Sequence, residues 1–150
     1  MFPLTYSEVF LRLTAAVAVG AIIGLDREIR RKAAGLRTMA LVSLGSAVFI
    51  LAAFDSGGGV SHDATSRAIQ GVVTGIGFLG AGTILRGETE SSIKGLTTAA
   101  SIWLSAASGV ACGLAAWPLV IGSVLLGVLV LILSPVERII HNRRKTDLPG

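Results

Sequence analysis

The chain has 150 residues, of which 52% are hydrophobic and only 15% are charged, and its mean hydropathy is +0.76. About a quarter of the residues in an ordinary soluble domain carry a charge, so this composition excludes such a domain and indicates a membrane protein. The net charge of +4 does not indicate nucleic-acid binding, because the basic residues are concentrated in a few segments of the chain, as in a membrane protein of fixed orientation. The single cysteine excludes an internal disulfide and a CxxC motif.

The first predicted helix covers residues 8–25 and contains an uncharged stretch from Leu13 to Leu25. This stretch is long enough to span a bilayer only if the helix extends back past Arg12, whose long side chain can reach the lipid headgroups. A secretory signal peptide begins with positive charge, whereas Glu8 is the one charged residue before Arg12. We therefore expect a retained first span.

The next two predicted helices cover residues 37–54 and 67–86, and each contains an uncharged stretch about one bilayer long. The connection between them, residues 55–66, contains a run of glycines and is expected to be flexible and external. Two further spans are therefore predicted here.

The stretch from Gly95 to Val136 contains no Asp, Glu, Lys, Arg or His. As one helix it would be roughly 60 Å long, about twice the thickness of the hydrocarbon layer, so it indicates two spans. We predict helices at 95–111 and 116–134, with Pro118 in the first turn of the second. A re-entrant hairpin is the competing topology.

The positive-inside rule orients these helices, because Lys and Arg accumulate on the cytoplasmic side of a membrane. Most of the thirteen basic residues lie in segments 26–37, 86–95 and 136–150, whereas Arg12 and Arg67 lie on the opposite side. The prediction is an all-α, polytopic membrane helix bundle of about five transmembrane helices, with the N-terminus outside and the C-terminus inside. No second domain is expected within residues 1–150.

Gly75, Gly77 and Gly80 spell the GxGxxG pattern of dinucleotide-binding folds. That motif follows a strand and opens a helix, whereas here it lies inside a predicted span and no acidic residue follows about twenty positions later. A nucleotide site is therefore disfavoured.

Close helix packing is the better interpretation of these glycines, because small residues let helices approach one another in lipid. Bending of the helix around a bound ion is the alternative. Three GxxxG pairs have the packing spacing: Gly20 with Gly24, Gly71 with Gly75, and Gly109 with Gly113.

Catalytic and metal sites are not indicated. The side chains of Ser61, His62 and Asp63 are consecutive and so point apart, whereas a catalytic triad converges in space. His62 and His141 fall on opposite sides of the predicted membrane, so they cannot bind the same metal ion. Asp55 and Asp63 offer at most a loose site for a hydrated cation. We therefore expect a non-enzymatic protein with no cofactor and no metal.

The segment between the first two helices carries the densest charge. Two acid–base pairs have the favourable i,i+4 spacing, Asp26 with Arg30 and Glu28 with Lys32. Asp26, Arg27 and Arg37 lie where the spans enter the membrane, where a buried charge needs a partner. We hypothesise a charge pair that closes this end of both helices.

Four sequence blocks resemble the MgtC/SapB family of bacterial membrane proteins. They are Gly24-Leu-Asp-Arg-Glu28, Ala34-Gly-Leu-Arg-Thr38, Thr74-Gly-Ile-Gly-Phe-Leu-Gly-Ala-Gly-Thr83, and Gly95-Leu-Thr-Thr-Ala-Ala-Ser-Ile-Trp103 continuing to Ala106 and Gly109. The blocks occur in order and extend from the first predicted helix to the fourth.

This resemblance implies a non-enzymatic, multi-pass protein of the bacterial inner membrane that serves adaptation to magnesium limitation and acid stress and, in some pathogens, survival inside macrophages. The matching candidate positions are Asp26, Arg27, Glu28, Arg37, Thr38, Gly75, Gly77, Gly80, Gly82, Thr97, Thr98 and Trp103. Asp26 stands where the family usually has Glu. We expect the C-terminal cytosolic domain of longer members to be absent, and with it the functions of that domain.

Two classes of function follow. In the first, the protein is a regulator that binds a second copy of itself or another membrane protein, such as the ATP synthase that the family resemblance implies. In the second, it is a small Mg²⁺ or H⁺ transporter or channel, with Arg12, Asp26 and Arg37 lining a path. The regulator is favoured, because no acidic residue lies in the middle of a predicted span.

The predicted topology also places Cys112 near the external surface.

Overall fold

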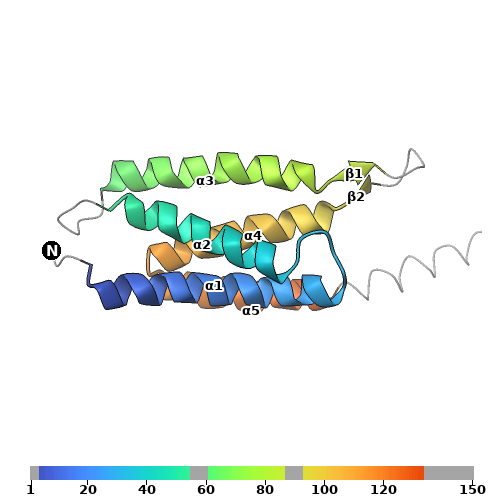
Figure 1. The fold of residues 1–150 in the computed structure, drawn as a ribbon, viewed down its shortest axis with the longest axis horizontal. Helices are drawn as coiled ribbons and strands as arrows, with labels where there is room; N and C mark the ends of the chain where they lie inside the picture. Colours follow the sequence, from blue (N-terminus) through green and yellow to red (C-terminus); the bar gives the residue numbers. More distant parts are fainter. Residues whose placement is uncertain (1–3, 55–60, 87–92, 134–150) are drawn as a thin grey trace, which may run out of the picture.

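The computed structural model describes residues 4–54, 61–86 and 93–133, and in these ranges it contains five helices and one pair of short strands (Figure 1). The elements are α1 (Tyr6–Ile29), α2 (Leu36–Ala52), α3 (His62–Gly82), β1 (Leu85–Arg86), β2 (Ile93–Lys94), α4 (Leu96–Gly113) and α5 (Trp117–Ile132). The predicted five helices are confirmed within the described residues. The glycine run at 57–59 and the basic tail after Pro135 lie outside them.

Consecutive helices run in alternating directions along the long axis of the molecule (Figure 1). The connection between α1 and α2 and the β1–β2 pair therefore lie at the same end, which we call the charged end because it carries residues 26–37. The opposite end carries the start of α1 and the end of α4.

The predicted bounds of the third helix, 67–86, are wrong at both ends. The helix begins earlier because the Ser61 side chain caps it and accepts a hydrogen bond from the Ala64 amide at 3.3 Å. It ends at Gly82, and Leu85 then pairs with Lys94 in a strand pair that the sequence did not indicate. Gly95 follows with φ of +98°, where a side chain would collide with the Thr83 carbonyl oxygen.

The long uncharged stretch folds as two helices, α4 and α5, as predicted. The turn between them places Ala115 at φ of 55°, and Pro118 occupies the first turn of α5, where its missing amide hydrogen does not matter. The structure thus confirms that the stretch forms two helices joined by a turn.

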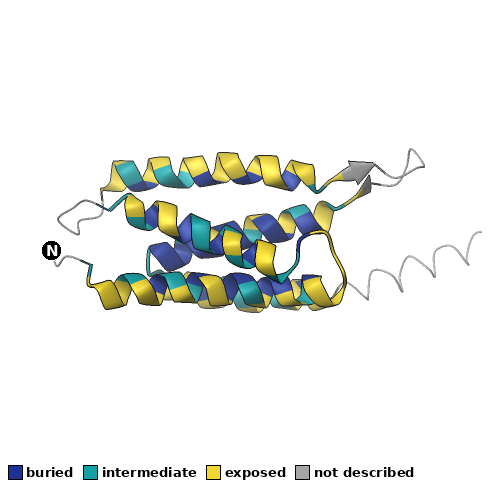
Figure 2. Ribbon diagram, viewed as in Figure 1, coloured by how far each residue is buried: buried dark blue, intermediate teal, exposed yellow. Residues whose placement is uncertain are grey.

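Helix α4 is the centre of the fold, because it packs against α1, α2, α3 and α5. Its buried residues are mostly small or carry a hydroxyl group, and the Ser105 hydroxyl donates to the Met39 carbonyl oxygen of α2 at 2.7 Å. Figure 2 shows the buried positions on α4 and on the sides of its neighbours that face it. The outer faces expose large apolar side chains such as Phe10, Phe78 and Leu126.

Two of the three predicted GxxxG pairs pack helices closely. A Cβ atom on Gly24 would lie 2.6 Å from the Leu36 Cα, and one on Gly109 would lie 2.8 Å from the Ser43 Cα, so no side chain fits at either position. The prediction for Gly71 and Gly75 is wrong within this chain. A Cβ atom on either would meet no described atom within 4 Å.

Within the described residues, two helices, α1 and α4, are long and apolar enough to cross a bilayer by length and composition, whereas α2 and α5 are apolar but shorter. The five spans, their orientation and the single transmembrane domain therefore stay predictions.

The packing predicts opposite effects of one substitution at two glycines. Gly109→Ala should lower the free energy of unfolding by about 1–3 kcal/mol, because the new methyl group meets the α2 backbone. Gly45→Ala should leave stability unchanged or raise it by up to about 1 kcal/mol, because the space there is open and alanine favours a helix. Thermal unfolding of the purified proteins in detergent measures both, and equal midpoints would contradict the packing described here.

Candidate functional site

Arg27 and Thr98, two of the predicted candidates, meet at the charged end. The Arg27 side chain leaves the last turns of α1, and its Nη2 donates to the Thr98 Oγ1 at 2.6 Å in the first turn of α4. Arg27 is 3% exposed and Thr98 is 4% exposed. The structure thus joins residues from the first and fourth sequence blocks in one buried contact.

Asp26 pairs with Arg30, its Oδ1 lying 2.7 Å from the Arg30 Nε, which confirms this predicted i,i+4 pair. Its other carboxylate oxygen is buried and has no hydrogen-bond partner. Arg37 and Thr38 lie on the exposed side of α2. The hypothesis of a charge pair that joins the ends of both helices is therefore wrong for Asp26, because its partner is Arg30, the residue directly after α1, and not Arg37 of α2.

Glu28 has a role that the sequence did not reveal. Its Oε2 accepts a hydrogen bond from the Leu36 amide at 3.1 Å, at the first residue of α2. Gly35, the preceding residue, has no side chain for this purpose, so Glu28 satisfies the free amide and places negative charge at the positive end of the helix. The predicted pair with Lys32 is absent among the described contacts, because α1 ends at Ile29.

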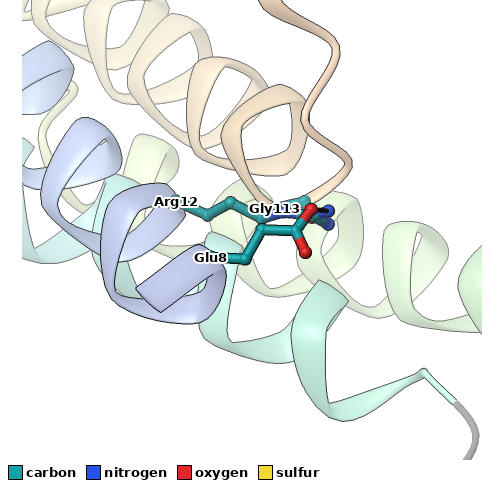
Figure 3. A network of polar contacts seen from close by, with 3 residues as sticks. All are labelled: Glu8, Arg12 and Gly113. Carbon is teal, nitrogen blue, oxygen red and sulfur yellow. Dashed lines mark hydrogen bonds and ion pairs between the residues drawn. The ribbon is translucent and has the colours of Figure 1, made fainter. Parts of the chain in front are cut away.

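Arg12 makes a matching contact at the opposite end (Figure 3). Its Nη1 donates to the Gly113 carbonyl oxygen at 2.9 Å, and its Nη2 lies 2.7 Å from the Glu8 Oε1. The guanidinium carbon also lies 5.6 Å from the centroid of the Phe54 ring. The expectation that Arg12 extends to the headgroups is wrong: the side chain is 8% exposed and caps the C-terminal end of α4.

The two buried arginines fix how α1 lies along α4. Arg12 contacts the last residue of α4, and Arg27 contacts its first turn. The arginines are about four helical turns apart on α1, and their partners are the same distance apart on α4. A shift of one helix along the other would break both contacts together.

The remaining candidates lie on the outer faces or at helix contacts. Gly80 packs beside α4, with the Cδ1 of Trp103 3.8 Å from the position of an added Cβ. Gly77 and Gly82 have no described atoms near that position, and Thr97 is exposed. Because the GxGxxG pattern lies inside α3, it lacks the strand-to-helix turn that nucleotide binding needs.

An apolar groove of about 570 Å³ lies between α2 and α3. Gly45 of α2 and Gly71 and Gly75 of α3 lie along it, and Leu41 and Phe49 form part of its wall. A Cβ atom on any of these three glycines would meet no atom of the described residues within 4 Å, so the groove gives them a common outward surface.

Two further features of the sequence are the single cysteine and the possible metal ligands. Cys112 lies in the last turn of α4, at the end opposite the charged end, but it is 0% exposed, so its thiol is buried in the core and is not accessible. In the described part of the chain, no group of three or more His, Cys, Asp or Glu side chains could hold a metal.

Comparison with known proteins gives one family and several relatives. The family model described as "MgtC family" matches residues 13–141. Protein MgtC of Salmonella typhimurium is 49% identical over 104 residues, covering 69% of this chain and 42% of the relative. Protein SrpB of Synechococcus elongatus is 44% identical over 117 residues, covering 72% and 64%, respectively.

Protein MgtC of Brucella abortus is 45% identical over 102 residues, covering 67% of this chain and 40% of the relative. The chain therefore spans less than half the length of the Salmonella and Brucella relatives. No solved structure gives a significant match.

The Arg27–Thr98 contact predicts that Thr98→Val lowers stability. The change keeps the shape of the side chain but removes the oxygen that accepts from the buried guanidinium, so we expect a loss of about 1–3 kcal/mol in the free energy of unfolding. Thr97→Val is the matched control, because the adjacent side chain is exposed. Thermal unfolding in detergent compares them, and an equally stable Thr98→Val protein would show that the contact contributes nothing.

Proposed function

The chain belongs to the MgtC family, and from this we propose that it is a non-enzymatic, multi-pass protein of the bacterial inner membrane that serves adaptation to magnesium limitation or acid stress. The apolar outer faces and the apolar helices α1 and α4 support membrane placement.

We propose that all five helices cross the bilayer, with the N-terminus outside. The alternating helix directions support this, since an odd number of spans places the two ends of the chain on opposite sides. The charged end then faces the cytoplasm, in keeping with the positive-inside rule. In this arrangement α4 and α5 are two full spans instead of a re-entrant hairpin.

The protein acts as a regulator by binding a transmembrane helix of another protein in the groove between α2 and α3. One observation carries this proposal: Gly45, Gly71 and Gly75 line the groove, and a Cβ atom on any of them would meet no described atom. Small residues let helices approach closely where no hydrophobic force drives them together. Inside this chain, Gly20 and Gly24 already pack against α2 in this way.

The candidate partners are a subunit of the membrane ATP synthase and a second copy of this chain. Either could present the apolar helix that the groove accommodates. Through such contacts the protein would alter ion or proton energetics without carrying ions itself.

Filling the groove tests the proposal. Gly75→Leu should leave the protein folded, because its side chain enters open space, but should abolish cross-linking to the partner and growth support at low magnesium. Gly122→Leu is the matched control, since the space beside Gly122 on α5 is also open but lies outside the groove. The assay is complementation of a strain that lacks the protein, with membrane levels measured in parallel. Normal complementation by Gly75→Leu would contradict a role for the groove.

A small Mg²⁺ or H⁺ transporter is the second candidate, and a buried hydroxyl group between α2 and α4 favours it. The Ser43 hydroxyl of α2 is buried and has no hydrogen-bond partner, whereas the Ser105 hydroxyl of α4 already donates to the α2 backbone. Arg12 and Asp26 lie at opposite ends of α1, so they do not line one site together. Arg37-dependent flux of Mg²⁺ or H⁺ into liposomes containing the purified protein would favour transport over regulation.

Cysteine labelling tests the orientation. In a Cys112→Ala background, Tyr6→Cys should react with a membrane-impermeant maleimide added to spheroplasts, because Tyr6 is 95% exposed at the external end of α1. Ile29→Cys, at a position 74% exposed near the charged end, should react only after the membrane is opened. The reverse pattern would invert the topology, and labelling of both from outside would argue against the spanning arrangement.

A further inference from the structure

The two buried arginines of α1 face opposite electrostatic surroundings. Arg12 lies at the C-terminal end of α4, where the helix dipole is negative, and it has the Glu8 carboxylate beside it. Arg27 lies at the N-terminal end of the same helix, where the dipole is positive. The first arrangement is favourable for a cation, whereas the second is not.

No described carboxylate neutralises Arg27 alone. Asp26 is close enough to attract it, but Arg30, which repels it, is paired with the same carboxylate. Glu28, the next acid along α1, is bound to the α2 amide instead. Among the described residues, Arg27 therefore shares its nearest carboxylate with a second guanidinium, although it is only 3% exposed.

Hydrogen-bond donors also remain free at this place. The Arg27 Nε is buried and has no partner, and it shares one edge of the planar guanidinium with the Nη2 that contacts Thr98. Gly95 gives α4 no side-chain cap, and the amides of Leu96, Thr97 and Thr98 donate to no described atom. The Thr98 hydroxyl accepts from Arg27, so its own hydrogen is available as well.

We propose that Arg27, the Thr98 hydroxyl and the first-turn amides of α4 form a binding site for a phosphate group. A phosphate group has several acceptor oxygens and negative charge, which match a guanidinium edge and the N-terminal end of a helix. The phosphate comes from an anionic phospholipid headgroup or from inorganic phosphate. Binding would place negative charge beside the buried Arg27 guanidinium and give its Nε an acceptor.

This site goes beyond the proposed regulatory function and is tested without a partner protein. The purified chain in phospholipid-free maltoside detergent is studied by amide hydrogen exchange at Leu96, Thr97 and Thr98. Inorganic phosphate should slow their exchange about tenfold at a concentration near ten times its Kd, relative to chloride of equal ionic strength. The Leu36 amide, already bound to Glu28, serves as the internal control and should not change.

Two arms separate the sources of the phosphate group. Protection by inorganic phosphate alone identifies free phosphate as a ligand, whereas protection only by added phosphatidylglycerol identifies a lipid headgroup. Protection by neither, as expected if water alone fills the site, would overturn the proposal.

Variants then assign the effect to Arg27. Arg27→Gln should abolish the protection, whereas Arg67→Gln, at an exposed arginine near the start of α3 and at the opposite end, should retain it. Retained protection in Arg27→Gln would place the ligand elsewhere and also overturn the proposal. If Arg27→Gln does not fold, the response of the unmodified protein at Leu96, Thr97 and Thr98 decides the question. The complementation assay with Gly75→Leu tests only the groove between α2 and α3, so its outcome does not affect the test of phosphate binding.

Discussion

The pair of buried arginine contacts between α1 and α4 is the constraint on which the bundle depends. In lipid, one apolar helix slides along another with little change in hydrophobic energy, so polar contacts and close packing must set the register. Arg12 and Arg27 supply those contacts at the two ends of α4. Because a buried guanidinium without acceptors is strongly unfavourable, both contacts hold only in one alignment.

The small residues of α4 make this alignment possible. Gly109 brings α4 against the backbone of α2 near Ser43, and the Ser105 hydroxyl is then close enough to bind the Met39 carbonyl oxygen. The buried serine hydroxyls of α4, those of Ser101, Ser105 and Ser108, thus find backbone acceptors instead of remaining unpaired in an apolar interior. Function is left to the surfaces outside this core, which are the groove between α2 and α3 and the charged end.

The sequence predicted the helices well because long uncharged stretches leave few other structures in a membrane. It predicted their ends less well, since the cap of α3 by Ser61 and that of α2 by Glu28 depend on local hydrogen bonds. Arg12 and Gly113 are far apart in the sequence, so no local pattern could pair them.

The GxxxG pattern likewise identified surfaces suited to close packing but not the helix opposite each one. Gly20 and Gly24 pack within the chain, whereas Gly71 and Gly75 face outward with the same spacing. Of the candidate site, Arg27 and Thr98 converge as a buried pair, while Arg37 and Thr38 lie on an exposed side of α2.

The fixed spacing of the two arginines also limits how α1 can change in length during evolution. Inserting or deleting one residue between Arg12 and Arg27 would turn one of them about 100° around the helix axis, away from its acceptor on α4. A compensating change would have to occur in α4 at the same time. Descendants of this chain should therefore gain or lose residues at the ends of α1 and keep its interior at constant length.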